Sequence, residues 1–170
     1  MCIRDRCVGC VWCESGSDTK VRYLKELGFD AAYNYKTISS LKDTLTEACP
    51  NGIDMYFDNV GGDFFDTILP MMNQFGRLAV CGQISTYNDT EPRKGPQPGY
   101  PILIKQLKVQ GFMAQRWFVE WPKAFKVLDG WIKEGKLKYR ETVTEGFDKM
   151  FDAFLGLFTG ENIGKAVVKA

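Results

Sequence analysis

A short polar segment follows an apolar run in the middle of the chain. Residues 53–57 read Ile-Asp-Met-Tyr-Phe, with the length and composition of a strand, and Asp58-Asn59 and Gly61-Gly62 follow closely. In open α/β sheets, ligands bind outside the carboxyl ends of the strands, and glycines there let the backbone come close. The segment predicts either a ligand contact through Asn59 or an ordinary turn. Taken alone, it favours the turn.

Three cysteines near the start have a spacing found in metal sites. Cys7, Cys10 and Cys13 form C-x2-C-x2-C, which is close to an iron–sulfur or zinc signature. The next cysteine is Cys49, so a fourth nearby ligand is absent. If residues 8–12 form a strand, this spacing also turns neighbouring cysteines to opposite faces. We therefore expect no bound metal, and metal binding remains the rival hypothesis for this segment.

Composition excludes several classes of function. The chain has no histidine, which removes Ser-His-Asp and Cys-His nucleophile chemistry and every zinc site that needs histidine. Its 22 Lys and Arg balance 21 Asp and Glu over 170 residues, so nothing points to nucleic acid as a partner. No run of 18 apolar residues occurs, which predicts no membrane span. Six cysteines and a start without a signal-peptide hydrophobic region favour a cytoplasmic protein with free thiols.

Helical and strand patterns alternate from residue 16 onward. Ser17 is an N-cap residue type and Gly28 a typical helix end, and Val21, Leu24 and Leu27 lie on one face between them. Pro70 must kink or end a later helix. The patterns predict, in order, a helix over 17–28, a strand over 29–35, a helix over 39–50, the strand of 53–57, a helix over 63–76 and a strand over 78–81. This alternation predicts a parallel sheet with helices on both faces.

The pattern changes at residues 85–101, where four prolines favour a loop rather than a helix or strand. Loops of this length are usually functional lids or disordered segments, and both interpretations stay open here. The rest of the chain predicts a strand over 108–113, a helix over 121–134, a strand over 138–146, a helix over 147–160 and a strand over 164–170.

Four segments in order resemble one enzyme family. They are GSDTKVRYLKELGFDAAYNYKT (16–37), YFDNVGG (56–62), GRLAVCGQISTYN (76–88) and GENIGKAVVKA (160–170). Together they are similar to the prostaglandin and alkenal reductases, which are zinc-independent members of the medium-chain dehydrogenase/reductase superfamily. The match runs from about Gly16 to Ala170 and corresponds to the C-terminal half of such an enzyme.

The resemblance implies an α/β fold, a partial Rossmann domain with a doubly wound parallel sheet. The family's first strand and its Gly-rich turn are missing, since no G-x-G-x-x-G or A-x-x-G-x-x-G occurs in the chain. The family's strand order is 3-2-1-4-5-6, so strands 2-3 and 4-5-6 lose their common neighbour. We expect an atypical start over 1–15, a partial NADP-binding domain over 16–115 with a proline-rich loop over 88–101, and C-terminal helices and a strand over 116–170.

The same resemblance implies NADP as the cofactor. Lys20 and Tyr35 match positions that contact the adenosine 2′-phosphate, where a cation pairs with the group that distinguishes NADP from NAD. Glu14 departs from the small residues that the family has near the end of that strand, where NAD enzymes place a carboxylate. The cofactor contacts that the resemblance implies are Lys20, Tyr35, Asn59, Cys81, Gly82, Gln83, Ile84, Ser85, Thr86, Tyr87, Phe112, Met113, Ala114 and Asn162.

Tyr87 is the expected catalytic residue. Reduction of a conjugated enone delivers hydride to the β-carbon and leaves negative charge on the carbonyl oxygen. A phenol can donate a hydrogen bond to that developing enolate without any metal. Alternatively, Tyr87 is a loop tyrosine that only packs.

The expected function is that of a C-terminal cofactor-domain fragment of an NADPH-dependent reductase. Its substrates would be α,β-unsaturated ketones and aldehydes of the oxo-prostaglandin and alkenal type, and the full-length enzyme would be a homodimer. The fragment alone would be inactive. The alternative is a non-catalytic nucleotide-binding or dimerisation fragment, with a partner added along residues 108–113. Enone reduction in the presence of an N-terminal partner would distinguish the two.

Overall fold

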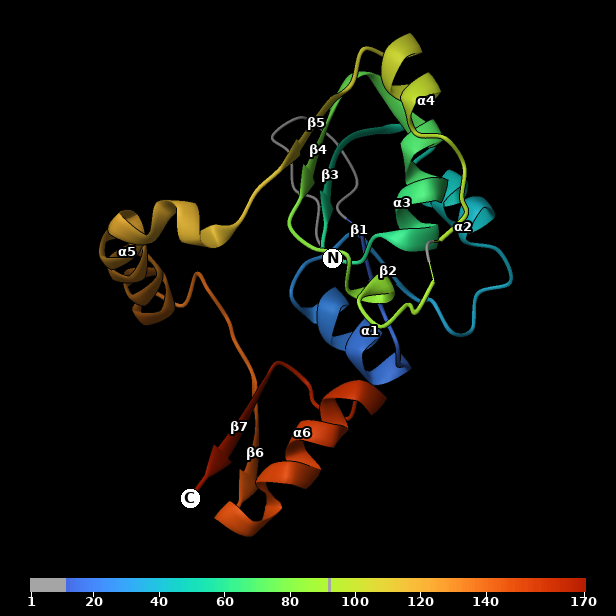
Figure 1. The fold of residues 1–170 in the computed structure, drawn as a ribbon. Coiled ribbons are helices and arrows are strands. Elements are labelled where there is room, and N and C mark those ends of the chain that lie inside the picture. Colours follow the sequence, from blue (N-terminus) through green and yellow to red (C-terminus); the bar gives the residue numbers. More distant parts are fainter. Residues whose placement is uncertain (1–11, 92) are drawn as a thin grey trace. The chain divides into compact units, whose positions relative to one another are not determined.

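The computed structural model describes residues 12–91 and 93–170 (Figure 1). The chain divides into two compact units, Met1–Arg116 and Trp117–Ala170. The expected start of the chain, with Cys7 and Cys10, lies outside the described residues.

The first unit opens with a strand–helix–strand motif. Strand β1 (Trp12–Ser15) pairs in parallel with β2 (Ala31–Asn34), and α1 (Asp18–Glu26) connects them. The Ser17 hydroxyl accepts a hydrogen bond from the Lys20 amide and caps the helix start, while Gly28 has φ +93° just beyond its end. The expected helix over 17–28 and the strand over 29–35 are confirmed.

The second part of this unit is a three-stranded parallel sheet in the order β3-β4-β5. The helices are short, and Ser40 caps α2 through its hydroxyl. In chain order the elements are α2 (Leu41–Ala48), β3 (Ile53–Asp58), α3 (Gly62–Ile68), a 3₁₀ turn (Leu69–Met71), β4 (Met72–Val80), a 3₁₀ turn (Ile84–Thr86), α4 (Gly99–Ile104) and β5 (Lys108–Gly111).

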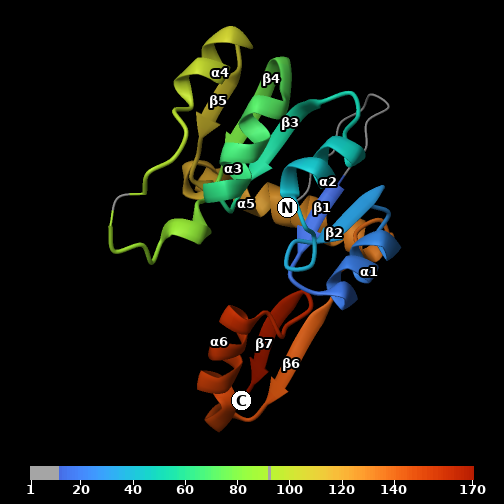
Figure 2. The ribbon, with the colours of Figure 1, turned by 90° about the vertical axis from the view of Figure 1, so that its right-hand side faces the viewer.

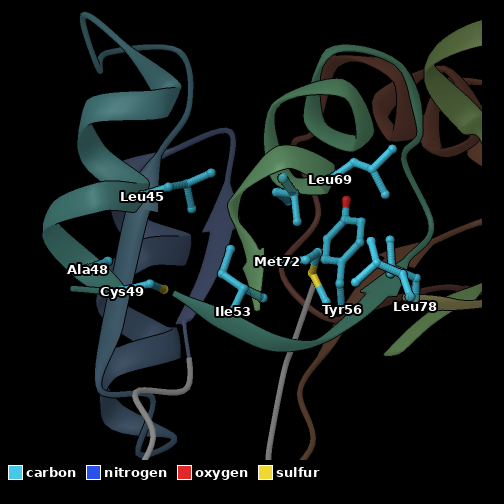
Figure 3. Packing of buried hydrophobic residues seen from close by; sticks show 10 residues of the cluster. Leu45, Ala48, Cys49, Ile53, Tyr56, Leu69, Met72 and Leu78 are labelled. Atoms are coloured by element: carbon cyan, nitrogen blue, oxygen red, sulfur yellow. The ribbon is translucent and has the colours of Figure 1, made fainter. Parts of the chain in front are cut away.

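The core lies between this sheet and the helices α2 and α3. Leu45 and Cys49, at α2, meet Ile53 and Tyr56 of β3, while Leu78 of β4 packs in the same cluster (Figure 3). Its other members, all buried, are Ala48, Ile68, Leu69, Met72 and Leu107. This packing fixes β3 and β4 and therefore the loops that leave their carboxyl ends.

The strand pairing confirms the α/β fold class with parallel sheets. Within the part of the chain that the structure describes, β1 and β2 form one sheet and β3, β4 and β5 form another. No described strand pairs with both sets.

Two element boundaries differ from the sequence prediction. The helix predicted over 63–76 ends at Ile68, and a 3₁₀ turn containing Pro70 leads directly into β4 at Met72. Proline lacks the amide that would continue the helix. The first residues of β4 bulge, since Ile53 pairs with Met72 but Met55 pairs with Arg77, and Phe75 takes φ +64° within this irregularity.

The proline-rich loop also ends earlier than predicted. Residues 99–101, expected to be loop, form the first turn of α4 (Gly99–Ile104). Pro101 lies in this first turn, where its missing amide costs no helical hydrogen bond.

The second unit holds the remaining predicted elements. A 3₁₀ segment (Ala114–Glu120), which the sequence did not predict, leads into α5 (Trp121–Lys133). Strands β6 (Glu141–Glu145) and β7 (Lys165–Lys169) pair in parallel, and α6 (Met150–Thr159), after a short 3₁₀ turn at Phe147–Lys149, lies beside them (Figure 2). The described helices include none that is long and apolar enough to cross a membrane.

Candidate functional site

The carboxyl ends of β3, β4 and β5 bring three predicted segments together. Asp58 pairs with Val80, and Val80 pairs with Gly111, so the three parallel strands end at one edge of the sheet. The chain continues from these ends into residues 59–62, 81–87 and 112–114. The grouping predicted from the sequence for these segments is therefore present.

Strand β4 leaves the sheet along the backbone of β3. The Asp58 carbonyl accepts hydrogen bonds from the Cys81 amide at 2.7 Å and the Gly82 amide at 3.1 Å. A Cβ at Gly82 would lie 3.2 Å from the Asn59 carbonyl oxygen and 3.1 Å from the Tyr87 hydroxyl. A side chain here would be tighter than an ordinary contact, so glycine favours the close approach of the two backbones at this point.

The turn at 59–62 holds the segment that contains Tyr87. The Asn59 carbonyl accepts from the Ile84 amide at 3.2 Å, and the Val60 carbonyl accepts from the Ser85 amide at 3.1 Å. The Ser85 hydroxyl also donates to the Val60 carbonyl at 2.6 Å. The Ser85 hydroxyl is thus bonded within the protein, and its contact with a cofactor stays a prediction.

Tyr87 is exposed at the end of this segment. Its hydroxyl accepts a hydrogen bond from the Gln83 amide at 3.1 Å, which directs the phenol back over the loop. A tyrosine hydroxyl that accepts one bond can still donate its own proton. The geometry therefore leaves Tyr87 able to donate to a substrate oxygen. Thr86 is engaged differently, since its hydroxyl donates to the Gln83 carbonyl at 3.0 Å.

The double glycine makes room for a neighbouring segment of the chain. Gly61 and Gly62 have φ values of +66° and +60°, where residues with a Cβ are strained. A Cβ on Gly61 would lie 3.0 Å from Gln83, and one on Gly62 would lie 2.6 Å from the Ser85 hydroxyl. The glycines therefore admit the 83–85 segment beside the turn.

Tyr35 and Lys20 lie at the corresponding end of the β1–β2 pair. Tyr35 directly follows β2, and its ring meets Phe64 of α3 edge-on, with 6.0 Å between ring centres. A Cβ at Gly16 would lie 3.1 Å from the Tyr35 hydroxyl, so this hydroxyl lies over the turn that leads into α1. Lys20 is in the first turn of that helix and is half-buried. The two residues therefore lie on adjacent turns.

The last predicted contacts divide between the two units. Phe112 is half-buried and packs on Phe57, with 5.8 Å between ring centres, and Met113 and Ala114 are exposed just beyond it. Asn162 belongs to the second unit, where its side-chain amide donates to the Gly164 carbonyl at 2.7 Å. Its contact with a cofactor stays a prediction.

The sequence did not point to two contributors to this site. Gly16 stands only at the start of a matching segment, although its lack of a side chain admits the Tyr35 hydroxyl and the Lys36 chain. Asp58 belongs to the polar segment predicted to follow the strand, yet its fully buried carboxylate binds the turn amides of Val60 and Gly61. An aspartate two residues before a glycine-containing turn is a known signal for such a bond.

A hollow of about 620 Å³ lies beside the turn and the proline-rich loop. Its lining includes Gly62 and Asp66 on one side and Gln83 and Thr86 on the other. Arg93 of the loop pairs with Asp63 of α3 and reaches Asp66 at 3.6 Å, which ties the loop to the helix.

The sequence pattern of the zinc-binding dehydrogenase family matches residues 8–130. This match covers most of the chain. The chain belongs to the zinc-binding dehydrogenase family.

Relatives and solved structures in this family extend the comparison. The chain is 52% identical to prostaglandin reductase 1 of Rattus norvegicus over 158 residues, which is 92% of this chain and 48% of the rat protein. It is 41% identical to a 2-alkenal reductase (NADP(+)-dependent) of Nicotiana tabacum, over 91% of this chain and 45% of that protein. The resemblance to the prostaglandin and alkenal reductases is confirmed. The chain spans about half the length of these curated relatives.

A crystal structure of CurA from Vibrio vulnificus in complex with NADPH superposes with a TM-score of 0.83 at 35% sequence identity. The superposition covers 94% of this chain and 49% of CurA. This similarity confirms the cofactor-domain type of fold.

The family's name raises the question of zinc. The sequence has no histidine, and residues 12–91 and 93–170 hold no group of three or more Cys, Asp or Glu side chains arranged to bind a metal ion. The side chains in the described part of this chain therefore do not fit a zinc site.

Proposed function

We propose that this chain is the cofactor-binding part of an NADP-dependent reductase. Its substrates would be α,β-unsaturated ketones and aldehydes of the oxo-prostaglandin and alkenal type, reduced at the C=C bond. The observation that carries the proposal is the loop at 81–87, which the turn at 59–62 holds at the sheet edge with the Tyr87 hydroxyl exposed. The prostaglandin and alkenal reductases among the relatives support the substrate class.

The residues at the sheet edge fit a dinucleotide. Gly82 and the pair Gly61-Gly62 let the two turns pack closely against each other at the sheet edge, where dinucleotides bind in folds of this type. Lys20 and Tyr35 supply a cation and a hydroxyl for a 2′-phosphate at the ends of β1 and β2. Bound NADPH would supply the hydride, and the NADPH complex of CurA, at 35% identity, supports this choice of cofactor.

The protein's own contribution to the reaction is electrostatic. When hydride reaches the β-carbon of the substrate, negative charge develops on the carbonyl oxygen. Tyr87 donates a hydrogen bond to that oxygen and stabilises the enolate. The Gln83 amide, bonded to the Tyr87 hydroxyl, holds the phenol in position and increases its donor strength.

The test is a completed enzyme, in which this chain is joined to the residues that precede the matched region in rat prostaglandin reductase 1. We expect it to oxidise NADPH in the presence of 3-nonen-2-one and to form the saturated ketone. No turnover by this folded chimera, with the intact rat enzyme active in the same assay, would contradict the proposal.

Two further features are proposed for the whole protein. We infer a homodimer formed along β5, because β5 pairs with β4 on one side and no described strand covers its other edge. We also infer a cytoplasmic location, and Cys49 and Cys81 are free thiols, as expected of a reducing compartment. Light scattering measures the oligomeric state of the completed enzyme. A monomer would contradict the dimer and would leave the proposed reductase function untouched.

A non-catalytic nucleotide-binding or dimerisation role is the second candidate. The open β5 edge favours it, because such an edge can pair with another chain in the absence of any chemistry. NADPH binding by the completed enzyme without enone reduction would favour this candidate.

A further inference from the structure

The carboxylate of Asp58 is buried beneath the candidate site, where it binds the turn after β3. Its side chain has 0% exposure at the last position of β3. Oδ1 accepts hydrogen bonds from the Gly61 amide at 2.8 Å, the Val60 amide at 2.9 Å and the Tyr56 hydroxyl at 3.1 Å. Oδ2 has no hydrogen-bond partner among the described residues. Burial of a carboxylate with one bare oxygen is costly, so its retention calls for an explanation.

The bonds made by Asp58 determine where the 59–62 turn lies. Its side chain binds the amides of Val60 and Gly61, and its own carbonyl binds those of Cys81 and Gly82. Asp58 thus fixes the turn at 59–62 and the start of the segment at 81–87. Tyr56 anchors the carboxylate from within the core, because it is 1% exposed and packs among the buried residues of β3 and β4.

The turn passes this constraint on to the loop of Tyr87. With the amides of Val60 and Gly61 held by Asp58, the carbonyls of Asn59 and Val60 point at the amides of Ile84 and Ser85. The 3₁₀ turn Ile84–Thr86 begins at these bonds, and Tyr87 follows it directly. Asp58 is therefore linked to the Tyr87 loop through the backbone of the turn, and the Ser85 hydroxyl adds a bond to the Val60 carbonyl.

We propose that Asp58 is a positioning residue that holds the 83–87 loop, and with it the Tyr87 hydroxyl, in place through the 59–62 turn. The carboxylate touches neither substrate nor cofactor in this role. That Asp58 holds the loop follows from the hydrogen bonds alone, whereas its effect on turnover rests on the proposed function.

Amide hydrogen exchange in the 170-residue chain tests the structural part. Asp58→Ala should speed exchange of the Ile84 and Ser85 amides by about tenfold, since it removes two hydrogen bonds that order the turn. Amides in the middle of β3 and β4 should change little. Asp58→Asn should restore wild-type exchange, because its carbonyl oxygen still accepts where Oδ1 did. A wild-type chain without protection at Ile84 and Ser85 would overturn the proposal.

Two variants keep this measurement decisive. Asp54→Ala is the matched control on the same strand. Asp54 accepts a hydrogen bond from Asn73 at the opposite end of β3. This substitution should leave the exchange rates of the Ile84 and Ser85 amides unchanged. If Asp58→Ala does not fold, Tyr56→Phe, which removes one donor to Oδ1, should cause a smaller increase at the same two amides. Unchanged exchange in the folded variant, or an equal increase in every core amide, would overturn the proposal.

A double-mutant cycle in the completed enzyme tests the catalytic consequence. Asp58→Ala should lower kcat, and Asp58→Ala with Tyr87→Phe should be within about twofold of the slower single variant, because both changes act through one hydroxyl. The positioning role would be overturned if the two single reductions in kcat multiplied in the double variant. An unchanged kcat in Asp58→Ala would overturn it as well. An inactive wild-type chimera would contradict the proposed function and leave the exchange result standing.

Discussion

Tyr87 is the residue on which the proposed chemistry depends. Tyr87→Phe in the completed enzyme should lower kcat for enone reduction by roughly ten- to a thousandfold, the range for the loss of one oxyanion donor. NADPH binding should change little, because the role proposed for the hydroxyl is a hydrogen bond to the substrate oxygen. Stopped-flow measurement of hydride transfer checks this. An unchanged rate, with hydride transfer shown to limit turnover, would remove Tyr87 from the mechanism.

Lys20 should set the preference for NADPH over NADH. Lys20→Ala removes a cation from the first turn of α1, and a charge-assisted bond to a phosphate contributes about 1.5–3 kcal/mol. The KM for NADPH should rise by about ten- to a hundredfold and the KM for NADH should stay nearly constant. Lys25→Ala, in the last turn of the same helix, is the control. An equal rise in the KM values for NADPH and NADH would contradict a 2′-phosphate contact by Lys20.

At the residue scale, the sequence predicted which segments meet but not how they are held. Asn59, Gly82 and Tyr87 come together because parallel strands end at a common edge, a rule that needs only the element order. The bonds of Asp58 were not predicted, because whether a strand-end carboxylate faces the core or the solvent depends on the packing of Tyr56 and its neighbours. Asn162 stays a prediction.

At the element scale, the turn after β3 should tolerate no side chain at Gly62. An alanine there would adopt φ +60° and displace either the Ser85 hydroxyl from the Val60 carbonyl or Arg93 from Asp63. Gly28→Ala is the matched control, since Gly28 also has positive φ but open space around it. Both should lower the free energy of unfolding by about 1–3 kcal/mol through strain. The free energy of unfolding of Gly62→Ala should fall by about 1 kcal/mol more, because this variant also loses one of the two displaced contacts.

Urea denaturation of the two variants measures this difference. Equal losses would show that the packing of residues 83–85 and 93 against the turn contributes nothing to stability. A larger loss in Gly28→Ala would contradict the contacts that the structure places around Gly62.

Helices and strands were predictable where local signals agreed. Ser17, Ser40 and Gly28 mark helix ends in the sequence and in the structure alike. The helix predicted over 63–76 was wrong beyond Ile68, because Met71, Met72 and Phe75 suit a helix as well as a strand. Burial of Met72 against the core decides for the strand, and no local pattern contains that information.

At the scale of the whole molecule, the 170-residue chain alone should bind NADPH poorly and show no enone reduction. It contains no G-x-G-x-x-G turn to hold a pyrophosphate. Its described strands form separate sheets, so β1 and β3 each keep an edge that no described strand pairs with. Titration with NADPH, followed by tryptophan fluorescence, and an assay with 3-nonen-2-one check both points. Micromolar binding with turnover would contradict this expectation.

The way in which the 83–87 loop is held has a consequence for protein engineering. Ile84 is attached to the turn through its backbone amide, and its side chain is 67% exposed next to Tyr87. Every residue except proline can form that backbone bond. Libraries at position 84 can therefore vary the exposed surface beside Tyr87 without loosening the loop, and so at little cost in stability.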